Sequence, residues 1–108
     1  MVSFSLTYLI DFKFIVLYTL FSIGPLPSDI GKLSELKYFD AQFNYFTSSS
    51  IPISIGMLQN LEYLNIADTY LSGNIPSEIG MLSLLSSLHL ESNELSGMFL
   101  FNKMSTHR

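Results

Sequence analysis

Apolar and polar positions recur along this chain in a pattern that returns every 24 residues. Between residues 61 and 97, five positions occur twice at this distance: Leu61, Leu64, Ile66, Leu71 and Gly73 are followed by Leu85, Leu88, Leu90, Leu95 and Gly97. A fixed period of about twenty to fifty residues is typical of a solenoid, in which each repeat buries its apolar face against its neighbours. The pattern therefore predicts a stack of similar coils.

Strict alternation of apolar and polar residues marks one short segment in each repeat. The segments read YFDAQ, YLNIA and SLHLE, and a period of two is typical of a strand with one buried face. We expect strands near residues 38–41, 63–66 and 87–90. A polar bend and an Ile-Pro pair follow in the complete repeats. Since Pro52 and Pro76 cannot donate to a strand ladder, we expect the return segment to be irregular or a short 3-10 turn.

An asparagine position follows each predicted strand. Asn44 and Asn93 occupy it, and their side-chain amides can bond backbone groups of the bend and of the neighbouring coil. Thr69 takes the same place in the middle repeat and offers a single hydroxyl, so we expect its contacts to be weaker. Gly73 and Gly97 allow a turn conformation that is closed to most residues.

The first 23 residues allow several interpretations. They are mostly apolar and aromatic, with Asp11 and Lys13 as interruptions, and the run over residues 14–23 has the length of the apolar part of a secretory signal. The stretch also fits a signal anchor, or a degenerate repeat in which Phe12, Ile15 and Leu17 keep the apolar spacing. We divide the chain into this N-terminal segment (1–23), the repeats (24–97), and a tail that is first apolar and then polar (98–108).

Composition excludes several classes of function. With 48% apolar and 13% charged residues, the chain of 108 residues is predicted to be one folded domain rather than a disordered segment. The net charge of −4, with five scattered basic residues, argues against a nucleic-acid partner. There is no cysteine, so neither a disulfide nor a thiolate metal site can form.

The pattern LxxLxLxxNxLxGxIPxxIGxL, which begins at Leu61 and recurs in part from Leu85, resembles the plant-specific leucine-rich repeat. The chain is similar to the ectodomains of plant leucine-rich-repeat receptor-like kinases and receptor-like proteins. This resemblance implies an α/β fold, a short solenoid arc with parallel strands on the concave face and 3-10 turns and loops on the convex face. It also implies a fragment or truncated relative of a cell-surface receptor that recognises a peptide, a hormone or a co-receptor ectodomain.

Candidate recognition residues follow from the strand alternation, because every second side chain leaves the core. Adjacent strands lie about 4.8 Å apart, so we expect Tyr38, Tyr63 and Ser87 to form one row across the sheet. The next row holds the positions that start at Asp40. The full set, with the bend residues, is Tyr38, Asp40, Gln42, Phe43, Tyr63, Asn65, Asp68, Ser87, His89 and Glu91. Aromatic and polar residues mix in this way on binding faces, although the same positions also fit a merely solvated sheet.

Catalysis is not expected. Ser87, His89 and Glu91 have the composition of a catalytic triad, but their Cα atoms step by about 6.6 Å along one strand face and their side chains point the same way. The carboxylates lack the loop spacing of a calcium site, and no phosphate-binding motif occurs.

The sequence therefore predicts a protein without enzymatic activity, cofactor or metal. We expect it at the cell surface or outside the cell, with a protein or peptide ligand or a co-receptor ectodomain as partner, and with residues 1–23 as a candidate membrane anchor. Two alternatives remain: a truncated structural remnant without a ligand of its own, and a secreted inhibitor-like leucine-rich-repeat protein.

Overall fold

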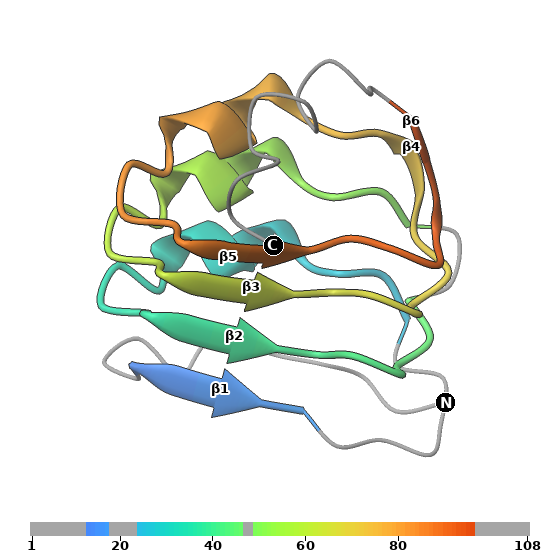
Figure 1. The fold of residues 1–108 in the computed structure, drawn as a ribbon, viewed down its shortest axis with the longest axis horizontal. Helices are drawn as coiled ribbons and strands as arrows, with labels where there is room; N and C mark the ends of the chain where they lie inside the picture. The colour runs from blue at the N-terminus through green and yellow to red at the C-terminus, as the bar shows by residue number, and fades with distance from the viewer. Residues whose placement is uncertain (1–12, 18–23, 47–48, 97–108) are drawn as a thin grey trace.

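The computed structural model describes residues 13–17, 24–46 and 49–96, and these residues form stacked coils (Figure 1). Expectations for Gly97, for the tail and for most of the N-terminal segment lie outside the described residues. In chain order the elements are β1 (Phe14–Val16), η1 (Ser28–Lys32), β2 (Tyr38–Asp40), η2 (Ile53–Met57), β3 (Tyr63–Asn65), β4 (Ser72–Asn74), η3 (Ser77–Met81), β5 (Ser87–His89) and β6 (Glu94–Ser96). The three η elements are 3-10 helices, as predicted for the return segments.

One parallel sheet carries the strands in the order β1-β2-β3-β5. The register pairs Tyr38 with Tyr63 and Tyr63 with Ser87, and each following position pairs in the same way. The predicted strands and the predicted rows are therefore confirmed, with each strand ending one residue earlier than expected. A leucine-rich-repeat solenoid has this architecture, so the predicted fold is confirmed as well.

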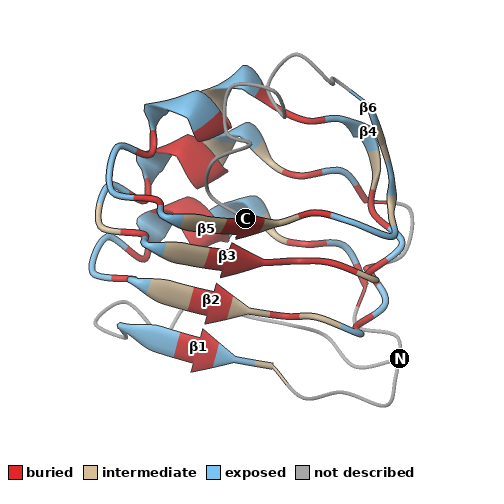
Figure 2. Ribbon diagram, viewed as in Figure 1, coloured by how far each residue is buried: buried red, intermediate tan, exposed pale blue. Residues whose placement is uncertain are grey.

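Apolar residues stack in columns inside the coils. One column contains Phe39, Leu64 and Leu88, which are each 3% exposed or less. The described core also includes Leu36, Leu61, Leu85, Ala41, Ile66, Leu90, Ile30, Ile55 and Ile79. Figure 2 shows the buried positions at the centre of each strand and on the inner side of the 3-10 segments. Burial of one residue per column in every coil explains why the apolar pattern must repeat.

The asparagine position joins neighbouring coils. Asn93 Oδ1 accepts from Thr69 N (3.0 Å), Thr69 Oγ1 (3.2 Å) and Leu71 N (3.0 Å). Asn93 Nδ2 donates to Ile66 O (2.7 Å) in the preceding coil and to Leu90 O (3.2 Å) in its own. Thr69 Oγ1 donates only to Ile66 O in its own coil among the acceptors of the described residues, apart from its contact with Asn93. The middle rung therefore lacks the backward bond that Asn93 makes, as its chemistry predicts.

A second parallel pair, β4 and β6, lies beyond the bend, where only a polar loop was expected. Coils of equal length bring equivalent backbone segments together whatever their side chains are, so Ser72 and its neighbours can pair without an apolar pattern. Gly73 has φ 81°, which agrees with its predicted role as a residue in a conformation closed to most others.

The described part of the N-terminal segment is a strand of the main sheet. Phe14 pairs with Tyr38, and Ile15 is 5% exposed in the common core. This is the position that a repeat strand requires. Within the described ranges, no helix is long and apolar enough to cross a membrane. The signal and anchor alternatives for residues 1–23 stay predictions.

Close packing between the 3-10 segments requires glycine. A Cβ atom at Gly56 would lie 2.7 Å from Glu78 Cβ and 2.9 Å from Glu78 O, and one at Gly31 would lie 2.8 Å from Ser54 Cβ. Real Cβ atoms do not approach backbone this closely, so each alanine would push η2 or η3 away from its neighbour.

We expect Gly56→Ala to lower the free energy of unfolding by about 1–3 kcal/mol, because the methyl group must displace the backbone at Glu78. Urea unfolding followed by circular dichroism measures this change. Gly80→Ala is the matched control, since Gly80 holds the same place in the last repeat and is exposed. Equal stability of the two variants would contradict the packing argument.

Replacement of Asn93 by alanine removes the acceptor of three groups and two donated bonds. We expect Asn93→Ala to lower the free energy of unfolding by about 1–3 kcal/mol, the cost of leaving such groups unpaired. Asn60→Ala is the control, because Asn60 makes one exposed bond to Ser34 O at 2.8 Å. A loss no larger than that of the control would show that the rung does not stabilise the stack.

Candidate binding face

The outward-facing side chains of β1, β2, β3 and β5 form a surface that we call the strand face. The exposed and buried positions alternate along β1, β2 and β5 as the period of two requires. Asn65 departs from this alternation, since it is only 6% exposed although it points away from the leucine core. Its neighbours on the face cover it, so the face has its own packed layer of polar residues.

Four rings form a column across the strand face. The ring centroids of Phe14 and Tyr38 are 6.3 Å apart, those of Tyr38 and Tyr63 are 4.2 Å apart with an interplanar angle of 5°, and those of Tyr63 and His89 are 5.5 Å apart. The two tyrosines are therefore stacked face to face along the solenoid. Because each ring covers the face of the next, ring edges and hydroxyl groups point outward from the column.

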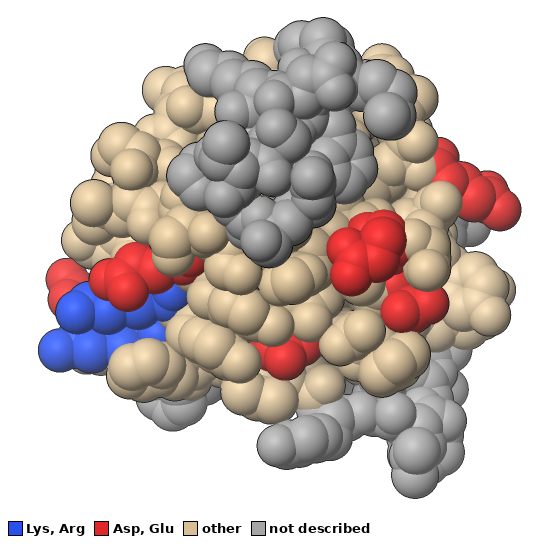
Figure 3. Space-filling view, in the orientation of Figure 1, with Lys and Arg blue, Asp and Glu red and all other residues tan. Residues whose placement is uncertain are grey.

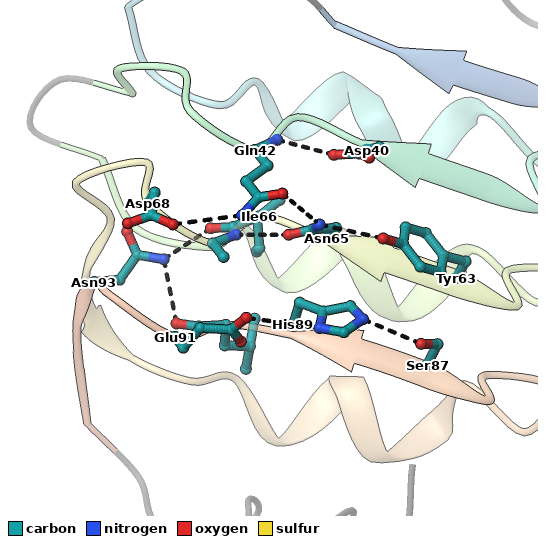
Figure 4. Close-up of polar contacts among 12 residues, drawn as sticks. Asp40, Gln42, Tyr63, Asn65, Ile66, Asp68, Ser87, His89, Glu91 and Asn93 are labelled. Carbon is teal, nitrogen blue, oxygen red and sulfur yellow. Dashed lines mark hydrogen bonds and ion pairs between the residues drawn. The ribbon is translucent and has the colours of Figure 1, made fainter. Parts of the chain in front are cut away.

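A polar network lies beside this column (Figure 4). Asn65 Nδ2 donates to Gln42 Oε1 (3.1 Å) and to the Tyr63 hydroxyl (3.2 Å). Gln42 Nε2 in turn lies 3.5 Å from Asp68 Oδ2. Asp40 Oδ1 accepts from Gln42 N at 3.1 Å, which closes a turn at the end of β2. The buried Asn65 thus connects two repeats and fixes the side chains of Gln42 and Tyr63.

Ser87, His89 and Glu91 are also connected. Ser87 Oγ lies 3.2 Å from His89 Nε2, and His89 Nδ1 lies 3.6 Å from Glu91 Oε2. The expectation that the strand spacing keeps these groups apart is wrong, because the imidazole lies along the strand and reaches both neighbours. A nucleophile also needs donors for the developing oxyanion. The nearest backbone donor, Ser87 N, already donates to Glu62 O at 3.2 Å, so the serine lacks that support.

The residues after the strands adopt a left-handed backbone. Phe43, Asp68 and Ser92 occupy the same position in successive repeats, with φ of 65°, 55° and 59°. Aspartate tolerates this region, whereas a phenylalanine there is uncommon. Phe43 is 70% exposed. The repeat therefore holds a large aromatic side chain out at the edge of the strand face.

Three exposed aromatic residues escaped the sequence analysis. Tyr70 has φ 63° and its ring centroid lies 4.6 Å from that of Tyr45, at the edge beyond the bend. Phe14, the first ring of the column, lies 24 residues before Tyr38, so the period itself could have found it. No comparable signal marks Tyr70, since the last repeat has Glu94 in that place.

Charge is distributed unevenly over the molecule. Lys13 and Lys37 immediately precede β1 and β2, whereas Asp68 and Glu91 follow β3 and β5. Figure 3 shows the basic surface gathered at one side and separate acidic patches over the rest of the view. Among the described residues, no group of three or more potential metal ligands comes together.

Comparison with known proteins gives the family. The Leucine Rich Repeat profile matches residues 60–82. Receptor-like protein EIX1 of Solanum lycopersicum is 42% identical over 50 residues, which cover 46% of this chain and 5% of that protein. The ectodomain of the receptor kinase SOBIR1 from Arabidopsis thaliana matches 88% of this chain and 52% of its own, with 28% identity and a TM-score of 0.77. This chain is built of leucine-rich repeats.

The predicted resemblance to plant leucine-rich-repeat receptors is confirmed by these matches. A further structure, of the plant peptide hormone receptor RGFR1 in complex with RGF2, is 37% identical with a TM-score of 0.72, over 79% of this chain and 14% of that one. The chain thus spans a twentieth of the curated relative and between a seventh and a half of the two receptor structures.

The connected serine, histidine and glutamate give a direct test of catalysis. We expect Ser87→Ala to hydrolyse p-nitrophenyl acetate at the same rate as the natural chain, because no oxyanion donor faces Ser87 and only the slow reaction of an imidazole remains. The measurement is the release of p-nitrophenolate, with His89→Ala as the control that removes the imidazole. Loss of turnover in both variants would identify a working nucleophile and overturn the non-catalytic interpretation.

Proposed function

We propose that this leucine-rich-repeat chain is a non-catalytic recognition module that binds a protein or peptide on its strand face. The observation that carries the proposal is the registered column of Tyr38 and Tyr63 beside the network through Asn65. Tyrosine offers a large contact area with few rotatable bonds and a hydroxyl that can bond a partner. These are the residue types that dominate binding energy in protein interfaces.

The face is also fixed before any ligand arrives. Stacking holds the tyrosine rings, and the bonds from Asn65 hold the hydroxyl of Tyr63 and the amide of Gln42. Ordering a side chain on binding costs about 0.5–1.5 kcal/mol. A face that is already ordered avoids part of this cost, which favours a binding role over that of a merely solvated sheet.

The similar proteins support the same class of function. RGFR1 is a peptide hormone receptor solved with RGF2, and SOBIR1 and EIX1 are a receptor kinase and a receptor-like protein. By this likeness, the chain is part of, or derived from, a plant cell-surface receptor. Its partner is then an extracellular peptide, a protein or a co-receptor ectodomain, and residues 1–23 are candidates for membrane association.

A random twelve-residue peptide library displayed on phage tests the proposal with the full chain as bait. We expect the selected peptides to bind Tyr38→Ala about tenfold more weakly than the natural chain, since truncation of an interface tyrosine removes a large contact. Titration of synthetic copies of the selected peptides measures the dissociation constants, and circular dichroism confirms that each variant is folded.

Met81→Ala is the matched control, because Met81 is 61% exposed on η3, away from the strand face. Peptides that bind Tyr38→Ala as tightly as the natural chain would place the binding surface elsewhere. A selection that yields no peptide above background would count against a recognition role.

A further inference from the structure

An acidic and aromatic edge borders the strand face where the strands end. We call it the exit rim and define it by Phe43, Asp68, Tyr70 and Glu91. We propose that the exit rim receives a basic side chain, lysine or arginine, of an extended peptide that lies on the strand face. The inference rests on the proposed recognition function and specifies the chemistry of its partner.

The carboxylates of the rim are weakly engaged within the described part of the chain. Asp68 Oδ2 has Gln42 Nε2 at 3.5 Å, which is at the limit of a hydrogen bond, and the side chain of Glu91 is 58% exposed with His89 Nδ1 at 3.6 Å. The described lysines lie elsewhere. Lys32 is 3.6 Å from Asp29 on η1, and Lys13 and Lys37 precede their strands. No described lysine or arginine therefore balances the two carboxylates.

The aromatic side chains of the rim provide a second attraction for a cation. Phe43 is 70% exposed and Tyr70 is 66% exposed. In successive repeats Phe43 and Asp68 hold the same position, and the backbones touch there through Phe43 N and Ala67 O at 3.3 Å. Unlike the stacked Tyr38 and Tyr63, these rings are largely open to solvent. An open ring face attracts an ammonium or guanidinium group within about 6 Å of its centroid.

Backbone conformation favours a functional interpretation of the same residues. Phe43 and Tyr70 both have positive φ, a region in which large side chains are uncommon. Such conformations persist only where the surrounding structure imposes them, and they cluster at ligand contacts. The ladder between coils imposes them here and keeps both rings at the edge of the face.

Charge complementarity selects the partner. A basic side chain would meet two carboxylates and two open rings, whereas an acidic one would meet like charge. Arginine fits both features, since its planar group can bond carboxylates and stack on rings. The tyrosine column would contact the rest of the peptide, so one ligand would use the apolar middle and the acidic edge of the same face.

The peptides selected on the full chain test this inference. We expect lysine or arginine to be enriched severalfold at one position over the unselected library. Neutralisation of the rim by Asp68→Asn with Glu91→Gln should weaken the selected peptides about fivefold to tenfold at low salt and less at 0.5 M salt, where charges are screened. Asparagine tolerates positive φ, so Asp68→Asn keeps the bend.

The matched control is Glu35→Gln with Glu94→Gln, which removes the same charge from exposed positions outside the rim. Selected peptides that lose affinity on Tyr38→Ala but show no basic enrichment, or that bind the neutralised rim and the control equally, would overturn this inference and leave the recognition function standing. An empty selection would overturn both.

Discussion

Hydrogen bonding between equivalent positions of successive coils is the constraint on which the rest of the structure depends. Ala41 N donates to Asn65 O at 2.8 Å, and Ile66 N donates to His89 O at 3.0 Å. Because each coil is the template for the next, equivalent side chains must meet one another. Leucine then packs on leucine, tyrosine on tyrosine, and Asn93 on Thr69. A residue in this chain therefore acts through its column as much as through its own coil.

The same constraint separates positions that the fold needs from positions that it leaves open. Column residues such as Leu64 and close-contact residues such as Gly56 have no alternative, because the adjacent coil occupies the space around them. On the strand face the ladder is satisfied by backbone atoms, so any residue compatible with a strand can stand there. Function in a solenoid is thus written on the face, and a shared fold leaves the partner undetermined.

This division explains what the sequence could predict. The period fixes the leucine columns, the strands to within a residue, and the rows that contain Tyr38, Tyr63 and Ser87. It does not fix rotamers or backbone dihedral angles. For that reason the approach of His89 to Ser87, the burial of Asn65 and the positive φ of Phe43 were not foreseen. The β4–β6 pair was missed for a related reason, since backbone pairing there needs no side-chain pattern.

The aromatic residues show why these unforeseen details matter for recognition. In the column, the faces of Tyr38 and Tyr63 are satisfied by each other, so a ligand meets only edges and hydroxyl groups there. Phe43 and Tyr70 differ because a left-handed backbone turns them away from any stack. The rigid middle of the face therefore supplies shape and hydrogen bonds, whereas the open rings and carboxylates at its edge supply attraction for charge. A ligand that used only the middle would leave the most exposed rings of the face in water.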